Sequence, residues 1–256
     1  MRLRIITLNL KGLANEWFER RCDVAVHGLR ELSPDVICFQ EATVHVGKRL
    51  YHQAAAIGAA IGLDSVAFSS YGAPGDDETE YLTGVAISSR WPMRRVRDRH
   101  LSVPQDARVV LMATLMAPGG DLDVITTHLA WPSDAAELRR RQAQVLFDEI
   151  TVNGWHAQGA RAVVAGDFNA TEDEPVIRFA SEGLTDTFRA RHPEEPGVTW
   201  IANNPYTAGF DFPDRRLDYV FCPPGVEVRD ARVVLDRPAP VYASDHFGVL
   251  ADLQWR

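Results

Sequence analysis

The sequence has few cysteines and no long apolar run, and these two absences exclude several protein classes. The cysteines Cys22, Cys38 and Cys222 are odd in number and widely spaced, which argues against both a disulfide framework and a structural zinc site. We predict reduced thiols, and we expect Cys22 and Cys38 to be buried because both lie in apolar patterns. The longest apolar stretch, residues 109–117, is far too short to span a bilayer.

The chain also lacks internal repeats, low-complexity segments and any linker long enough to separate domains. Its first ten residues contain only a short apolar run that Asn9 interrupts, unlike a signal peptide. The length of 256 residues and the hydrophobic fraction of 46% are those of an ordinary globular protein. We therefore expect a single domain over residues 1–256 that is monomeric and cytoplasmic and has no membrane span.

Basic residues are fewer than acidic residues in this chain, but they are concentrated in two segments. The net charge of −8 argues against broad, non-specific adhesion to nucleic acid. Residues 90–99 nevertheless carry five arginines, and residues 138–142 carry three. Such runs are commonly solvated faces, but they can also attract an anionic substrate. Under the second interpretation, Arg139 is a candidate substrate-binding residue.

Hydrophobic periodicity predicts strands and helices that alternate along the chain. Helices are expected from about Asn15 to Leu32, around 50–61 with Leu50, Ala54, Ile57 and Ile61 on one face, and near 134–150. Strands are expected at 2–10, 35–40, 65–70, 82–89, 108–117, 121–128, 161–166, 215–222, 226–235 and 246–255. The turn 118–120 should form a hairpin, and the loop 71–80 should be exposed and mobile. This pattern favours two packed sheets flanked by helices.

Polar residues stand where several of these strands end. The segment VVAGDFNAT (163–171) is typical: a buried strand stops on Asp167 and Asn169. Strand ends that a sheet brings together form one rim, so these groups are expected to converge there. The other members of the set are Asn9, Glu41, His128, Asp218, Asp245 and His246.

The acids of this set would repel one another without a counterion. A hard divalent cation resolves the repulsion, because Mg²⁺ prefers carboxylate, amide and water oxygens; Mn²⁺ is the alternative ion. Taken singly, each residue is ordinary, since a lone Glu after a strand is most often a surface residue and a lone His is most often structural. A serine hydrolase built on Ser244, Asp245 and His246 is disfavoured because the chain has no GxSxG elbow.

With these residues assembled, the chain resembles the endonuclease/exonuclease/phosphatase superfamily, which includes deoxyribonucleases, apurinic endonucleases, neutral sphingomyelinases and inositol polyphosphate 5-phosphatases. The matching motifs occur in the family's order over nearly the whole chain. They are TLNL (7–10), PDVICFQE (34–41), GVAISSR (84–90), TTHL (126–129), GDFNA (166–170), RLDYVF (216–221) and SDHFGV (244–249).

The resemblance implies an α/β fold, a four-layer sandwich of two packed mixed β-sheets flanked by helices, with the site at one rim. It implies a Mg²⁺-dependent phosphoesterase in which Glu41 is the principal metal ligand. Asn9 and Asp245 would be further ligands or would lie beside the metal.

The resemblance also implies catalytic roles. Asp167 would orient or deprotonate the attacking water, and Asn169 would hold a phosphate oxygen. His246 would stabilise the developing charge, with Asp218 orienting it. His128 falls where many members have histidine and apurinic endonucleases usually have tyrosine, and it would assist the leaving group or contact phosphate.

The substrate stays open at this stage. Trp200 lies in a segment that resembles the family's variable recognition loop, so it is a candidate substrate-binding residue, although a core position is equally compatible with it. The first hypothesis is a phosphodiesterase or nuclease acting on a phosphate ester such as nucleic acid. The alternatives are a phosphomonoesterase or lipid- or inositol-headgroup phosphatase, and a non-catalytic protein that binds a phosphate ligand.

Overall fold

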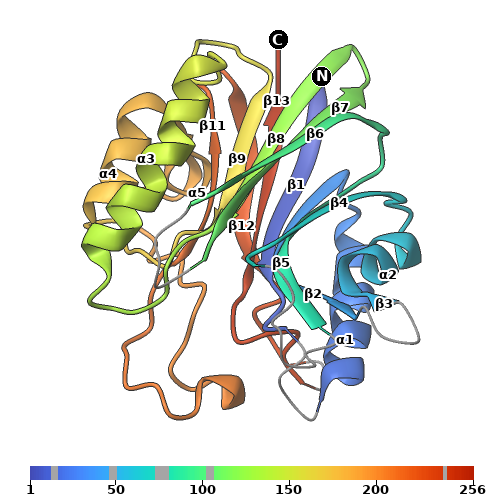
Figure 1. The fold of residues 1–256 in the computed structure, drawn as a ribbon, viewed down its shortest axis with the longest axis vertical. Helices are drawn as coiled ribbons and strands as arrows, with labels where there is room; N and C mark the ends of the chain where they lie inside the picture. The colour runs from blue at the N-terminus through green and yellow to red at the C-terminus, as the bar shows by residue number, and fades with distance from the viewer. Residues whose placement is uncertain (13–16, 46–50, 73–80, 102–106, 239–240) are drawn as a thin grey trace.

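Two β-sheets pack face to face, and helices cover the outer face of each (Figure 1). The computed structural model describes residues 1–12, 17–45, 51–72, 81–101, 107–238 and 241–256. The four layers and the two mixed sheets confirm the predicted fold class. None of the helices within these ranges is long and apolar enough to cross a membrane.

The first sheet has the strand order β12-β13-β1-β2-β5-β4, with β3 paired to β2. Its strands β1 and β2 run parallel, and the other pairs are antiparallel. The strands are β1 (Arg2–Asn9), β2 (Val36–His45), β3 (Tyr51–His52), β4 (Ser65–Ser70), β5 (Tyr81–Ser89), β12 (Glu227–Val234) and β13 (Gly248–Gln254).

The second sheet has the strand order β10-β11-β9-β8-β7-β6, and only β8 and β9 run parallel in it. The strands are β6 (Met93–His100), β7 (Val109–Ala117), β8 (Gly120–His128), β9 (Ala162–Asp167), β10 (Thr185–Asp186) and β11 (Asp218–Cys222). The hairpin between β7 and β8 confirms the turn predicted at 118–120.

Alternating apolar residues explain why the sheets stack. Residues such as Ile5, Val124 and Val163 point between the sheets and form one buried cluster. The opposite faces pack against helices, so central strands such as β9 are buried on both sides. The helices α1 (Phe18–Leu32) and α2 (Gln53–Ala60) pack on the first sheet. The other helices are α3 (Ala136–Val152), α4 (Pro175–Gly183) and α5 (Thr187–Arg191).

Several local predictions need comment. The helix start at Asn15, the position of Leu50 and most of the loop 71–80 lie outside the described residues. The helices α4 and α5 were not anticipated; α4 begins at Pro175, where the missing N–H costs no hydrogen bond. All three cysteines are free, as predicted, and Cys38 and Cys222 are buried, whereas Cys22 is only partly buried.

The arginine-rich run 90–99 forms most of β6, an exposed edge strand. Its side chains pair with neighbours of the same surface: Arg94 with Asp121, and Arg99 with Glu149 at 3.1 Å. Charged residues on an edge strand discourage pairing with other chains. The structure therefore favours a solvated, paired face over a substrate-attracting one.

Candidate active site

A pocket lies at the end of the sandwich where β1, β8 and β9 end beside the bulge of β2; this strand continues to His45, beyond the end predicted at residue 40. It collects residues from distant parts of the sequence. Its lining consists of Lys11, Glu41, His128, Trp131, Asp167, Asn169, Trp200, Phe210, Phe212, Arg215, Leu217, Asp245 and His246. Asn9 and Asp218 lie beside this lining and bond to it.

Strand register explains how three of these residues meet. Asp167 ends β9, and it stands opposite His128 of β8 on one side and Asp218 of β11 on the other. The preceding residue, Gly166, allows this close pairing, since a Cβ there would lie 2.2 Å from the carbonyl oxygen of Thr127. The glycine of the GDFNA motif is thus required by the sheet itself.

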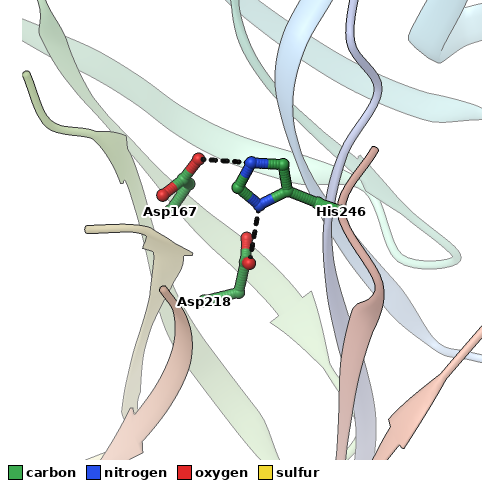
Figure 2. A group of neighbouring side chains, drawn as sticks. All are labelled: Asp167, Asp218 and His246. Atoms are coloured by element: carbon green, nitrogen blue, oxygen red, sulfur yellow. Dashed lines mark hydrogen bonds and ion pairs between the residues drawn. The ribbon is translucent and has the colours of Figure 1, made fainter. Parts of the chain in front are cut away.

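Asp167, Asp218 and His246 form a buried triad (Figure 2). Asp218 Oδ2 lies 2.9 Å from His246 Nδ1, and Asp167 Oδ2 lies 3.7 Å from His246 Nε2. Thr199 holds Asp218 in place, because its hydroxyl accepts hydrogen bonds from the backbone N–H groups of Leu217 and Asp218. An imidazole between two carboxylates is strongly favoured in its charged form.

The charges of this triad follow from its surroundings. Burial disfavours the His246 cation, but Asp218 and Asp167 outweigh burial and hold the pKa of His246 well above its ordinary value. Burial raises the pKa of Asp167 to about 7, against the opposing effect of His246. Asp167 is therefore a carboxylate with enhanced basicity, next to a fixed cation.

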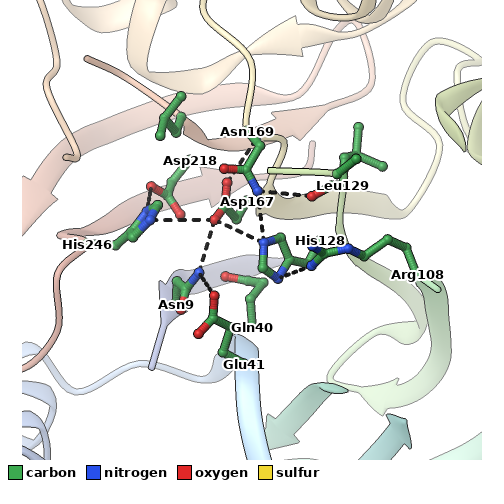
Figure 3. Close-up of polar contacts among 12 residues, drawn as sticks. Asn9, Gln40, Glu41, Arg108, His128, Leu129, Asp167, Asn169, Asp218 and His246 are labelled. Carbon is green, nitrogen blue, oxygen red and sulfur yellow. Dashed lines mark hydrogen bonds and ion pairs between the residues drawn. The ribbon is translucent and has the colours of Figure 1, made fainter. Parts of the chain in front are cut away.

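Asn9 connects this triad to Glu41 (Figure 3). Its amide nitrogen donates to Asp167 Oδ2 at 3.0 Å and to Glu41 Oε1 at 3.3 Å. The pairing of β2 with β5 is irregular between Phe39 and Ala42, and a bulge there turns Glu41 toward the pocket. Burial, together with Asp245, raises the pKa of Glu41, so this carboxylate is poorly neutralised by the protein.

His128 has a different environment from His246. Its Nδ1 lies 2.7 Å from the Tyr71 hydroxyl and 3.1 Å from Arg108, while its Nε2 lies 2.8 Å from the amide nitrogen of Asn169. Burial and the charge of Arg108 push the pKa of His128 well below its ordinary value. The ring is therefore neutral, although the Asp167 carboxylate also lies 3.5 Å from its Nε2.

Backbone strain is concentrated at this pocket. Lys11, Glu41 and Asn169 all have positive φ angles, of 53°, 52° and 48°. Side chains other than glycine rarely adopt this conformation, and strain of this kind is typical of functional sites. Hydrogen bonds hold it in place: the Asn169 N–H donates to Asp167 Oδ1, and the Lys11 N–H donates to Asn9 Oδ1.

The geometry is accompanied by a match to a known family. The model of the Endonuclease/Exonuclease/phosphatase family matches residues 7–246. The chain belongs to this family. Its members are phosphoesterases of the endonuclease, exonuclease and phosphatase type.

Solved structures share the fold over almost the whole chain. An endonuclease/exonuclease/phosphatase from Beutenbergia cavernae is 26% identical, with a TM-score of 0.76, and the match covers 99% of this chain and 72% of that one. Truncated Caenorhabditis elegans TDP2 is 18% identical, with a TM-score of 0.76 and coverage of 98% and 97%. The D. rerio TDP2 complexed with single strand DNA product is 20% identical, with a TM-score of 0.75 and coverage of 99% for both chains. No curated protein matches the sequence.

Endonuclease/exonuclease/phosphatase enzymes are metal-dependent in general, and two places in the pocket offer ligands. Asp167, Asp218 and His246 have ligand atoms within 4.8 Å of one another. However, the His246 cation lies between those two carboxylates and would repel a metal ion there. Burial and Asp245 outweigh His246, Asn9 and Lys11 and keep the pKa of Glu41 raised, so this carboxylate is incompletely neutralised and fits a hard divalent cation; Asn9 lies beside it with its amide nitrogen toward Glu41.

Aromatic side chains form the other side of the pocket. Trp200 lines it, as the sequence suggested, and is only 5% exposed. The guanidinium of Arg215 lies over the rings of Phe212 and Trp200, at 4.0 and 5.2 Å from their centroids. Beyond them, Trp131 packs edge-on against Phe210 at 6.1 Å, and both are half-exposed. One side of the pocket is therefore formed by polar side chains, and the other side by aromatic rings and the guanidinium of Arg215.

Arg139 does not line this pocket, contrary to the substrate-binding role expected of it. It is 1% exposed, pairs with Glu174 at 2.9 Å, and donates to the carbonyl oxygens of Ala130 and Pro132. Periodicity put Arg139 on a helix but could not show that the residue faces inward. Its position is structural: it fixes the segment that carries Trp131.

Several residues of the site were not anticipated from the sequence, and three of them bond to predicted site residues. Tyr71 and Arg108 bond to His128, and Lys11 bonds to Asp245 with its ammonium 2.9 Å from Oδ2. Tyr71 and Arg108 stand in segments without a motif, so only the fold reveals them. Lys11 was within reach of the sequence, because it follows the TLNL motif directly.

Proposed function

We propose that this protein is a Mg²⁺-dependent phosphodiesterase that hydrolyses a P–O bond by in-line attack of water. One observation carries the proposal: the Asp167 carboxylate lies 3.7 Å from the His246 cation and accepts a hydrogen bond from Asn9, which also binds Glu41. A base, a charge stabiliser and an oxygen-donor set for a metal therefore converge on one point of the pocket.

The side chains suit the steps of such a reaction. Asp167, with its raised pKa, would take a proton from the attacking water. His246 would donate from Nε2 to a phosphoryl oxygen and stabilise its growing negative charge, while Asp218 holds the ring through Nδ1. Asn169 would position a phosphate oxygen, and the neutral His128 would orient the Asn169 amide.

Glu41 would hold the divalent cation, with the Asn9 side chain beside it, and Mn²⁺ would be able to replace Mg²⁺. When bound, the ion supplies positive charge that neutralises the phosphate and lowers the repulsion that a nucleophile meets. Asp245 lines the same pocket, but the Lys11 ammonium already pairs with its Oδ2 at 2.9 Å.

A diester with an aromatic substituent, such as nucleic acid, is the substrate class that we propose. The wall of Trp131, Trp200, Phe210 and Phe212 offers faces on which a base can stack. The D. rerio TDP2, which shares this fold, is complexed with a single strand DNA product. A monomeric, cytoplasmic enzyme in which residues 1–256 act as a single domain remains our expectation.

The test is a substrate panel measured with Mg²⁺, with Mn²⁺ and with EDTA. It should include single-stranded and duplex oligonucleotides, sphingomyelin, inositol phosphates and nitrophenyl mono- and diesters. We expect metal-dependent cleavage of diesters, abolished in Glu41→Gln and retained in Asp64→Asn, an exposed aspartate outside the pocket. Preference for monoesters or headgroups would replace the substrate class, and inertness in every arm would contradict enzymatic function.

A further inference from the structure

The Lys11 ammonium lies in the pocket on the same side as Glu41 and Asp245. It donates to Asp245 Oδ2 at 2.9 Å and to the Tyr206 carbonyl oxygen at 2.8 Å. The other oxygen of Asp245, Oδ1, accepts a hydrogen bond from the Ser244 hydroxyl at 3.0 Å. Both oxygens of this carboxylate are therefore engaged by the protein itself.

We infer that Lys11 is a built-in cation of the site, which neutralises Asp245 and confines the divalent ion to Glu41. This inference rests on the proposed function, since it assumes a divalent ion at Glu41. It makes this a one-metal site and gives Lys11 a direct role in substrate binding.

The surrounding structure holds Lys11 in place. The guanidinium of Arg21, which is 2% exposed, donates to the carbonyl oxygens of Leu10 and Gly12, the residues on either side of Lys11. It also donates to the carbonyl oxygen of Ala243, two residues before Asp245, and lies 5.6 Å from the ring of Tyr206. One buried arginine thus fixes the segments that carry the ammonium and both of its acceptors.

Two further observations indicate that the position of Lys11 is not incidental. Its φ of 53° is strained for a residue with a side chain, so the backbone is bent to direct it here. The chain has 25 arginines but only two lysines. A compact ammonium, unlike the planar guanidinium, can stand in a position otherwise suited to a metal ion.

The ammonium has a further consequence for substrate binding. Asp245 and Tyr206 accept two of its three N–H bonds, which leaves one for a ligand in the pocket. A phosphoryl oxygen held near Glu41 and His246 would accept it. Lys11 would therefore contribute to phosphate affinity, which is measured through KM.

The experiment is titration calorimetry of Mg²⁺ into the substrate-free protein, repeated with Mn²⁺ and detected by electron paramagnetic resonance. We expect the wild type and Lys11→Arg to bind one ion. Lys11→Met should bind at least tenfold more tightly, or bind a second ion, because Asp245 is released as a ligand. Adding Asp245→Asn to Lys11→Met should reverse the gain, and Arg30→Met, which removes an exposed charge outside the pocket, should change nothing.

The outcomes separate this inference from the proposed function. Two ions in the wild type, or equal affinity and stoichiometry in Lys11→Met, would overturn the role of Lys11 while leaving a metal-dependent enzyme. A wild type that binds no ion, or whose binding is unchanged in Glu41→Gln, would remove both proposals. Thermal unfolding of each variant identifies any that fail to fold, and for these Lys11→Gln replaces Lys11→Met.

Discussion

His128 and His246 enter the same pocket from the two sheets, His128 at the end of β8 and His246 just before β13. They are similarly buried, at 2% and 6% exposed. Asp167 lies near both rings, at 3.5 Å from His128 and 3.7 Å from His246; His246 also has Asp218 and is cationic, whereas His128 also has Arg108 and is neutral. Burial therefore does not decide the charge of a histidine here; the neighbouring charges do, and they give two identical side chains different chemistry.

Substitutions of Asp167 and His246 should have the largest effect on turnover. We expect Asp167→Asn and His246→Ala each to lower turnover at least 100-fold, because one loses the base and the other the charge stabiliser. Steady-state kinetics on the best substrate of the panel, with circular dichroism as a fold control, would measure this. Near-wild-type turnover in either variant would refute the role of that residue.

The pH dependence of the rate should reveal the titration of both Asp167 and His246. The base must be deprotonated, so the rate should rise with pH through about 7, the pKa of Asp167. The His246 cation must persist, so the rate should fall as pH increases through its raised pKa. A profile of kcat/KM against pH would show these limbs, and a rate that stays flat to about pH 10 would contradict the second.

Asp218→Asn should shift His246 toward the neutral state that His128 has. Losing this carboxylate removes the largest attraction that opposes burial, so the pKa of His246 should fall. The alkaline limb should move to lower pH by the same amount, and turnover at neutral pH should drop about tenfold. An unchanged limb would mean that another group sets it. Asp64→Asn, an exposed aspartate outside the pocket, is the control.

Arg108→Met should have the opposite effect on the other histidine, because it should raise the pKa of His128. Removing this charge should raise the pKa of His128 toward its ordinary value, because Arg108 is the main charged group that lowers it. The NMR titration of the His128 ring protons would measure the shift, with His27 as an exposed internal reference. We expect a few-fold loss of activity at acidic pH, where the ring would gain a charge. A ring that still resists protonation would leave burial and the His246 cation as the causes.

Tyr71→Phe should have the smallest effect. It removes the hydroxyl that bonds to His128 Nδ1 and to the Glu41 N–H, at 2.7 and 3.2 Å. The loss of a buried hydrogen bond should lower the free energy of unfolding by about 1 kcal/mol. Turnover should fall less than tenfold, since Asn169 still holds the other ring nitrogen. A larger loss would show that Tyr71 acts on the substrate.

The sequence predicted most of the fold because its strands are apolar and regular, and because turns such as 118–120 are explicit. It also indicated most of the pocket residues, since polar groups at strand ends are unusual. It could not predict which neighbour each would have: the register that puts Asp218 beside Asp167 joins positions 51 residues apart. The same limit explains Arg139, whose inward direction depends on packing, and Tyr71, which carries no local signal.

The positive φ angles of Lys11, Glu41 and Asn169 have a practical consequence. Glycine at any of them would relieve conformational strain but would also remove the side-chain bonds of this rim, so stabilising substitutions here come at the expense of the site. A directed-evolution campaign that selects only for thermal tolerance would therefore tend to erode turnover at this rim. Selection on this scaffold needs an activity screen in every round.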